Sequence, residues 1–533
     1  MEDILKDYLM EDILDIIDGY LERGAKEEDY NKAFGVIKAI ADGGSGRAQN
    51  ILSKMYFTGE GVEKNIEKGI TYLIKAANQG CLEAQYNLGN MYYRGELVEK
   101  DYEKAVGYLK MAAGQGNINA QSKIGIMYYK GEGIERSYKK AIGWFIKAAK
   151  NGDETAQRFI GDIYYNGEGV EQNYFKAFDW YKRAADNDEA IAQSNLGNMY
   201  YKGEGTEKDY EKAAKWNMKA ADKGIVRSQY NLAYMYYKGE GVEKDYKKAV
   251  DWFIKAAEQG YIMAQYNLGN MYYNGIGVEK DYSKSLEWNL KAAEQGNVRA
   301  QYTLGYMYYK AEGIEKDYRK AALWYKKAAE QGDAMAQIGI ANMYYNGDGV
   351  VNDYQEAAKW YEKAAEQGNV LAEYNLGYMY LKGEGVEVNY EKALEWYEKA
   401  AKQDHIGAQY TLGYMYYKGE GVERDFDKSI EWYEKAAEQG YAVAQYNLGN
   451  IYYFGKVIKE DKDKAIKWYT KAAEQGHAAA QYNLGHMYNS GVGVEKSEKK
   501  AIEWWTKAAE GGEKRARILI NRLNGKEETI NLI

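Results

Sequence analysis

The chain has 533 residues, none of which is proline and only one of which, Cys81, is cysteine. A single cysteine excludes an intramolecular disulfide and a cysteine-based metal site. The net charge is −8, from 72 basic and 80 acidic residues. Because the two signs are interleaved, there is no basic stripe of the kind that binds nucleic acid.

The N-terminal segment, residues 1–47, is predicted to hold capping helices. Helical spacing of Ile4, Leu5, Leu9, Ile13, Ile16, Ile17 and Tyr20 indicates a first helix, and a second is expected to follow from Asp29 and Tyr30. Residues 1–14 carry five acidic side chains and no unbroken apolar stretch, unlike a secretory signal. No apolar run approaches about 18 residues, so no membrane insertion is expected. We therefore expect a cytoplasmic protein, with signal-less secretion left open.

Residues 48–515 consist of thirteen copies of a 36-residue unit without insertion or deletion. Each copy begins at the first residue of a recurring Ala-Gln pair (Ser228 in one copy, and Glu373 in place of Gln in another), and its 36 places are numbered from there. Apolar or small residues recur at places 1, 5, 6, 8 and 9 and again at 22, 23, 25, 26, 29 and 30. Both sets have helical spacing, so each copy is predicted to form two helices. The expected fold is all-α, with about 28 helices and no sheet.

The remaining fixed places predict where helices begin, end and touch. Place 18 is Asp, Asn or Ser in every copy, which predicts an N-cap for the second helix. Glycine dominates places 12, 14 and 33, as expected after helix ends. Place 6 is glycine in ten copies, although glycine within a helix costs stability, so it indicates close approach of the two helices. Place 25 is aromatic throughout and is expected to be buried. Residues 516–533 are predicted to be a capping half-repeat, Ala516–Asn524, with a frayed tail.

The recurring motifs are Leu-Gly-x-Met-Tyr, Gly-x-Gly-Val, Asp-Tyr-x-Lys-Ala and Trp-Tyr-x-Lys-Ala-Ala-x-x-Gly. In this order they resemble the Sel-1-like repeat, a relative of the tetratricopeptide repeat. The resemblance covers residues 48–515 and implies an α/α solenoid, a right-handed superhelix of helix-turn-helix repeats with one concave groove. It also implies a monomeric adaptor that binds protein or peptide partners. Its frequency in bacteria, with the heavy use of Lys, Asn, Tyr and Ile, favours a bacterial source.

By analogy with tetratricopeptide repeats, places 3, 7, 10 and 11 face the groove and would line it with phenols, amides and lysines. Tyrosine at place 10 has an alternative role, filling the space between repeats. At place 7, Asn and Tyr alternate from Asn198 to Tyr378, and each Tyr precedes a Lys by four residues, a spacing that can place the ammonium over the ring. The main docking stretch is predicted at 192–420; chance plus repeat duplication is the alternative. The predicted partner-binding residues are Tyr230, Tyr234, Lys238, Tyr266, Asn270, Tyr302, Tyr306, Lys310, Asn342, Tyr374, Tyr378, Lys382, Tyr410, Tyr414 and Lys418.

Residues for catalysis are scarce. His405, His477 and His486 are the only histidines, and no third ligand for a metal at His477 and His486 is evident, so no cofactor or metal is expected. Arg158 is the only basic residue at place 3 and is followed by Asp162 at place 7, which argues against a clamp for C-terminal carboxylates. Some cysteine-rich relatives resemble β-lactamases, but they need one disulfide per repeat, so a hydrolase is disfavoured.

We therefore predict a non-enzymatic scaffold that binds no nucleic acid. A secreted or surface factor of the same repeat family that engages host proteins is the alternative.

Overall fold

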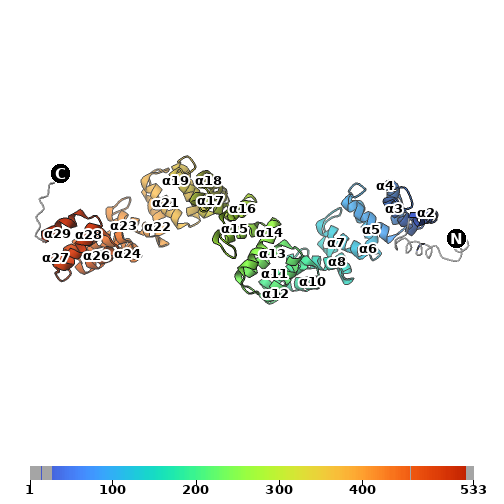
Figure 1. The fold of residues 1–533 in the computed structure, drawn as a ribbon, viewed down its shortest axis with the longest axis horizontal. Coiled ribbons are helices and arrows are strands. Elements are labelled where there is room, and N and C mark those ends of the chain that lie inside the picture. The colour runs from blue at the N-terminus through green and yellow to red at the C-terminus, as the bar shows by residue number, and fades with distance from the viewer. Residues whose placement is uncertain (1–13, 15–26, 456–457, 524–533) are drawn as a thin grey trace. The chain divides into compact units, whose positions relative to one another are not determined.

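The computed structural model describes residue 14, residues 27–455 and residues 458–523, and in these ranges it contains 28 helices and no strand (Figure 1). The all-α prediction is therefore confirmed. The chain divides into two compact units, the first formed by Met1–Ala264 with Ile276–Val278 and the second by Gln265–Gly275 with Glu279–Ile533. The first N-terminal helix predicted from the sequence falls, apart from Leu14, outside the described residues.

The first unit contains the helices of the N-terminal half. They are α2 (Glu27–Asp42), α3 (Gly46–Thr58), α4 (Ile66–Asn78), α5 (Leu82–Arg94), α6 (Tyr102–Gly114), α7 (Ile118–Lys130), α8 (Tyr138–Lys150), α9 (Glu154–Asn166), α10 (Tyr174–Asp186), α11 (Ala190–Lys202), α12 (Tyr210–Asp222), α13 (Val226–Lys238) and α14 (Tyr246–Glu258).

The second unit contains the remaining helices, of which the first has its opening turn in the other unit. They are α15 (Ile262–Asn274), α16 (Tyr282–Glu294), α17 (Val298–Lys310), α18 (Tyr318–Glu330), α19 (Ala334–Asn346), α20 (Tyr354–Glu366), α21 (Val370–Lys382), α22 (Tyr390–Lys402), α23 (Ile406–Lys418), α24 (Phe426–Glu438), α25 (Ala442–Phe454), α26 (Lys462–Glu474), α27 (Ala478–Ser490), α28 (Glu498–Glu510) and α29 (Lys514–Leu523). In each copy the odd-numbered helix is the first helix and the even-numbered one the second.

The helix boundaries follow from the fixed places. The place-18 side chain caps the second helix in all thirteen copies; Asp245, for example, accepts a hydrogen bond from the backbone N–H of Lys248 at 3.0 Å. Four described residues other than glycine have a positive φ, namely Leu97, Asp188, Ala311 and Asp404. All four stand at places 12, 14 or 33, where most copies have glycine. The left-handed turn is thus kept even where its preferred residue is lost.

The place-6 glycine makes room for the side chain at place 26. A Cβ built on Gly413 would lie 2.6 Å from the ring of Tyr433, and one built on Gly161 would lie 2.6 Å from the ring of Tyr181. Real Cβ atoms do not approach neighbours so closely, so glycine is a steric requirement in these copies, as predicted, whereas Ser53, Ala233 and Ala341 show that three other copies accommodate a Cβ. The place-26 rings are accordingly among the most deeply buried side chains, with Tyr433 2% exposed.

The tryptophans at place 25 are less buried than the sequence suggested. Trp324 and Trp360 are buried, but Trp252 and most others are only half-buried. Their outer faces are covered by lysine three residues later on the same helix; the Nζ of Lys255 lies 3.7 Å from the centre of the Trp252 ring. Place 25 therefore lies at the edge of the core, and place 26 lies inside it.

Buried glutamines join each copy to the one before it. The Nε2 of the place-2 glutamine donates to a backbone carbonyl at the end of the preceding second helix; Gln85 donates to Ala77 at 2.9 Å, and ten further copies repeat the bond. A second glutamine often donates to the place-2 glutamine in turn, as where Gln439 donates to Gln409 at 2.9 Å. These bonds satisfy polar groups that burial would otherwise make costly.

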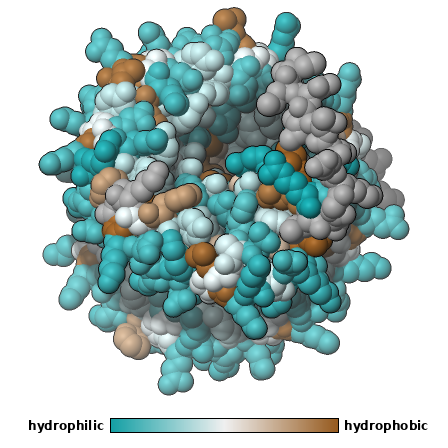
Figure 2. All heavy atoms as spheres, turned by 90° about the vertical axis from the view of Figure 1, so that its left-hand side faces the viewer, coloured by the Kyte–Doolittle hydropathy of each residue, from teal (hydrophilic) through white to brown (hydrophobic). Residues whose placement is uncertain are grey.

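The surface is mainly polar. Figure 2 shows hydrophilic side chains over most of the face in view, with hydrophobic ones in small separate groups. Among the described residues, no helix has the length and apolar character needed to cross a membrane.

The glycine–ring contact yields a matched pair of substitutions. Gly413→Ala is expected to destabilise the protein by about 1–3 kcal/mol, because the new methyl group overpacks the Tyr433 ring. Gly143→Ala, on α8, should have the opposite sign, a gain of about 0.5–1 kcal/mol, because a Cβ there meets nothing within 4 Å. Denaturant unfolding measures both changes. Equal effects of the two substitutions would show that helix propensity, and not the contact with Tyr433, explains glycine at place 6.

Candidate functional site

The predicted binding residues lie on one face of the first helices, which we define by places 3, 7 and 11 and call the first-helix face. Among the predicted residues, the side chains at places 3 and 7 are half-buried, except Tyr414, which is 39% exposed. The place-11 lysines, Lys238, Lys310, Lys382 and Lys418, are all exposed. The face therefore presents the edges of phenol rings and amides, with ammonium groups projecting beyond them.

Two hollows open on this face, one in each unit. The α11–α13 hollow has a volume of about 170 Å³ and is lined by Asn198, Tyr201, Asn217, Tyr230, Asn231, Tyr234 and Met235. The α23–α25 hollow has a volume of about 420 Å³ and is lined by Tyr414, Tyr417, Lys418, Tyr433, Tyr446, Asn447, Asn450, Ile451 and Phe454. Both use places 7, 10 and 26 of one copy and places 3, 4, 7 and 8 of the next, so they are equivalent positions in two separate units.

The hollows bring together four of the predicted residues, in two pairs. Tyr230 and Tyr234 line the first, and Tyr414 and Lys418 line the second. The other predicted residues occupy equivalent places but line neither hollow: Lys238, Tyr266, Asn270, Tyr302, Tyr306, Lys310, Asn342, Tyr374, Tyr378, Lys382 and Tyr410.

Part of each place-3 ring serves the fold itself. Tyr302, Tyr374 and Tyr410 each lie 5.7 Å, centre to centre, from the place-26 ring of the same copy. Such contacts stabilise by about 0.5–1.5 kcal/mol beyond burial. A place-3 tyrosine therefore offers a partner its exposed edge rather than its whole face.

The expected tyrosine–lysine pairs form only in part. Lys238 Nζ lies 5.7 Å from the centre of the Tyr234 ring, and Lys418 Nζ lies 5.9 Å from that of Tyr414. Lys310 instead lies over Tyr309, at 5.8 Å. Lys382 lies over no ring in the part of the chain that the structure describes. The distances that do form are near the outer limit of about 6 Å for this interaction, so these lysines are weakly held.

Tyrosine at place 10 ties neighbouring copies together. Its hydroxyl donates to the carboxylate at place 13 of the next copy, 39 residues later; Tyr93 donates to Glu132, Tyr165 to Glu204 and Tyr201 to Glu240, each at 2.7 Å. The pairs of Tyr273 with Glu312, Tyr309 with Asp348 and Tyr345 with Glu384 repeat the bond. Burial, followed by the bond to Glu132, raises the pKa of Tyr93 to about 12. In these six copies the tyrosine at place 10 therefore fills the space between repeats, which was the alternative to a role in the groove.

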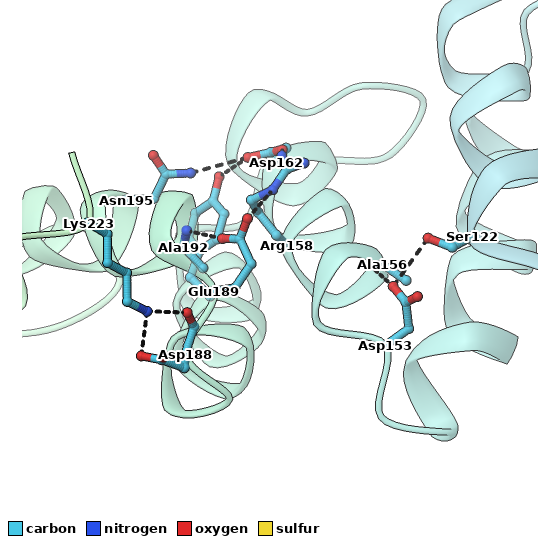
Figure 3. Close-up of polar contacts among 11 residues, drawn as sticks. Ser122, Asp153, Ala156, Arg158, Asp162, Asp188, Glu189, Ala192, Asn195 and Lys223 are labelled. Carbon is cyan, nitrogen blue, oxygen red and sulfur yellow. Dashed lines mark hydrogen bonds and ion pairs between the residues drawn. The ribbon is translucent and has the colours of Figure 1, made fainter. Parts of the chain in front are cut away.

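One polar cluster breaks the repeat pattern, at α9 (Figure 3). Arg158 forms ion pairs with Asp162 at 2.6 Å and with Glu189 at 3.2 Å, and all three side chains are less than 20% exposed. Asp162 also accepts a hydrogen bond from the hydroxyl of Tyr181 at 2.7 Å. Burial raises the pKa of both Asp162 and Glu189, although Arg158 opposes the shift. Both carboxylates bond to the same guanidinium, so the cluster joins α9 to the residue that precedes α11.

The histidines have structural partners. His405 and His477 are N-caps, whose Nδ1 atoms accept from the backbone N–H of Ala408 at 3.1 Å and of Ala480 at 3.2 Å. His486 lies against the rings of Tyr482 and Trp505. The described residues contain no group of three or more side chains placed to hold a metal ion.

Comparisons with known proteins identify the repeat. The Sel1 repeat model matches the chain thirteen times, from residues 46–81 to residues 478–513. The crystal structure of c5321, a protective antigen present in uropathogenic Escherichia coli strains that displays an SLR fold, is 32% identical, with a TM-score of 0.68, covering 94% of this chain and 98% of that one. A Sel1 repeat protein from Oxalobacter formigenes is 34% identical, with a TM-score of 0.50, covering 58% and 89%. None of the curated proteins matches the chain.

Because His405 and His477 cap the N-termini of α23 and α27, we expect the stability of these two helix ends to depend on pH. Burial lowers the pKa of His405 and His477 below the ordinary 6.5, and a protonated Nδ1 cannot accept the capping bond. A lowered folded-state pKa means that the stabilisation is complete above pH 6.5 and is lost as the pH falls from there through the folded-state pKa. The exchange protection of the Ala480 amide should therefore be constant above pH 6.5 and fall as the pH drops below that value. His477→Asn, which caps without titrating, should remove this dependence. The same pH dependence in the variant would mean that His477 is not its source.

Proposed function

The chain belongs to the Sel1 repeat family, and we propose that it is a non-enzymatic scaffold that binds an extended segment of a partner protein along its first-helix face. Such a role is consistent with the family, whose stacked repeats provide long binding surfaces. The observation that carries the proposal is the recurrence of a hollow at the same places of two separate units, each walled by tyrosine and asparagine.

The chemistry of the face suits peptides. Tyrosine offers a large contact area with few rotatable bonds and a hydrogen-bonding tip, and asparagine pairs with peptide groups as both donor and acceptor. The lysines Lys238, Lys310, Lys382 and Lys418 at place 11 add positive charge at intervals of 36 or 72 residues. The side chains of the first-helix face vary between copies, whereas place-2 glutamines such as Gln85 and place-10 tyrosines such as Tyr93 form hydrogen bonds between copies.

A second role follows from the relative named above. Since c5321 is a protective antigen, a protein that is exported and engages host molecules through the same face is the alternative. Fractionation of the source cells, with protease treatment of intact cells, separates the two: a surface protein is digested, whereas an internal scaffold is spared.

The face is tested by reversing its charge. Replacing Lys238, Lys310, Lys382 and Lys418 together with Glu should lower the affinity for captured partners by about tenfold or more, the loss expected when central interface contacts are removed. These side chains are exposed, so the fold should be retained.

The matched control changes four exposed lysines outside the face, Lys139, Lys215, Lys247 and Lys326, to Glu. It carries the same change in net charge and should leave binding unaltered. Partners captured from a lysate of the source cells, identified by mass spectrometry, provide the measurement. If both variants keep their partners, or both lose them equally, the first-helix face is not the docking surface.

A further inference from the structure

In the α23–α25 hollow, as at Tyr237 and Tyr453, the sequence has no carboxylate 39 residues after the place-10 tyrosine. In six described copies that hydroxyl donates to a carboxylate at place 13 of the next copy. For Tyr417 the sequence has Lys456 at that place instead. The Tyr417 hydroxyl makes no hydrogen bond to any residue that the structure describes, and it lines the hollow. The phenol that is occupied elsewhere is therefore available here as a donor.

The other polar groups of this hollow are also donors. Asn450 Oδ1 already accepts from the hydroxyl of Tyr469 at 2.7 Å and from Asn483 at 3.4 Å, so the group that Asn450 has left to offer is its Nδ2 amide. Lys418 Nζ lies 6.0 Å from the centre of the Tyr417 ring and forms no ion pair within the described ranges, although Glu420 follows two residues later. No carboxylate lines the hollow. Two neutral donors and one cation thus line a hollow that has no carboxylate among its lining residues.

Part of the wall of the hollow is apolar. Ile451 and the rings of Tyr433 and Tyr446 form its sides, and Phe454, which is 55% exposed, stands at its rim. A volume of about 420 Å³ lies within the range of roughly 300–1,000 Å³ typical of ligand sites. Phe454 and Lys418 both line the hollow, so a ligand with an apolar group next to an anionic group would complement them.

The equivalent α11–α13 hollow differs on each of these points. Its volume is about 170 Å³, no charged side chain lines it, and the hydroxyl of its Tyr201 is bonded to Glu240 at 2.7 Å. An anion there would meet an existing carboxylate. The two hollows share a position in the repeat but not a charge preference.

We propose that the α23–α25 hollow is a specificity pocket for a peptide segment in which a carboxylate side chain lies next to an aromatic or large aliphatic one. The carboxylate accepts from the Tyr417 hydroxyl and the Asn450 amide beside Lys418, and the apolar side chain lies between Ile451 and Phe454. This assignment rests on the proposed function, since it names the chemistry that one part of the first-helix face selects.

The test uses random dodecapeptides displayed on phage and selected on the full-length protein. The peptides enriched should contain Asp or Glu within about two residues of Phe, Tyr, Trp or Leu, because neighbouring side chains of an extended peptide lie about 7 Å apart or less. One selected peptide is then synthesised with a fluorescent label, together with its Glu→Gln or Asp→Asn version. Fluorescence anisotropy should show at least tenfold weaker binding for the amide version.

Variants of the protein locate the site. Lys418→Glu should weaken binding at least tenfold, and Tyr417→Phe, which keeps the ring and removes only the hydroxyl, should weaken it several-fold. Lys326→Glu, an exposed lysine on α18 outside the face, should leave binding unchanged. Circular dichroism confirms that each variant is folded.

The remaining outcomes overturn the inference in distinguishable ways. Selected peptides that lack an acidic residue, or that bind the Lys418→Glu and Tyr417→Phe variants as tightly as the unmodified protein, would show that this hollow is not a carboxylate pocket. If their binding is instead lost in a Lys238→Glu, Lys310→Glu variant, the scaffold function stands and only the pocket assignment falls. If no peptide is enriched and the four-lysine variant keeps all its captured partners, both fall.

Discussion

The contact between place 6 and place 26, a glycine against an aromatic ring in seven of the thirteen copies, holds the two helices of a copy close together, and the rest of the repeat depends on it. A glycine within a helix costs about 0.5–1 kcal/mol relative to alanine. Burying a large side chain contributes about 1.5–3 kcal/mol, which offsets that cost. The arrangement holds with rings as different as Tyr433 and Trp505, each of which lies within 2.6 Å of where a glycine Cβ would be. In the copies that have glycine at place 6, an added methyl group would force the place-26 side chain to move, whereas the copies with Ala233 and Ala341 accommodate one.

The hydrogen bonds between copies are the second interaction on which the fold depends. In each unit a helix touches mainly its neighbours in the chain, so stability is close to a sum of local terms. Buried glutamines such as Gln85, and phenols such as Tyr93, provide the specific part of each joint. Because both hydrogen bonds are buried or half-buried, a misaligned joint would leave polar groups without partners, at a cost of about 1–3 kcal/mol for each. Apolar packing alone would tolerate such a shift more easily, so the polar bonds fix the register.

The sequence predicted what lies within one copy better than what lies between copies. Caps such as Asp245 and the glycine turns depend only on residues a few positions apart, and both are confirmed. Places 25 and 26 are both aromatic in most copies, so periodicity could not decide which ring faces inward. The bond from Tyr93 to Glu132 spans 39 residues and becomes visible only once repeats are stacked, although its constant spacing is a signal in the sequence. Lys310 lies over Tyr309 and not over Tyr306. Both rings are close to this lysine in the sequence, so residue spacing alone could not decide between them. The binding role of the predicted residues remains a proposal.

A chain built from one repeated unit gains distinct binding sites only where the unit departs from its pattern. Some departures in this chain are compensated internally: Arg158 is paired with Asp162 and Glu189, and Glu373, at the place of a buried glutamine, still accepts a bond from Gln403. Other departures change the lining of the hollows. Asn217, at a place that is apolar or aromatic in most copies, lines the α11–α13 hollow with an amide, and Tyr417, which has no carboxylate 39 residues later, lines the α23–α25 hollow with its hydroxyl. A uniform scaffold can therefore discriminate along its length, because such substitutions change the side chains that line equivalent hollows while the helix boundaries stay the same.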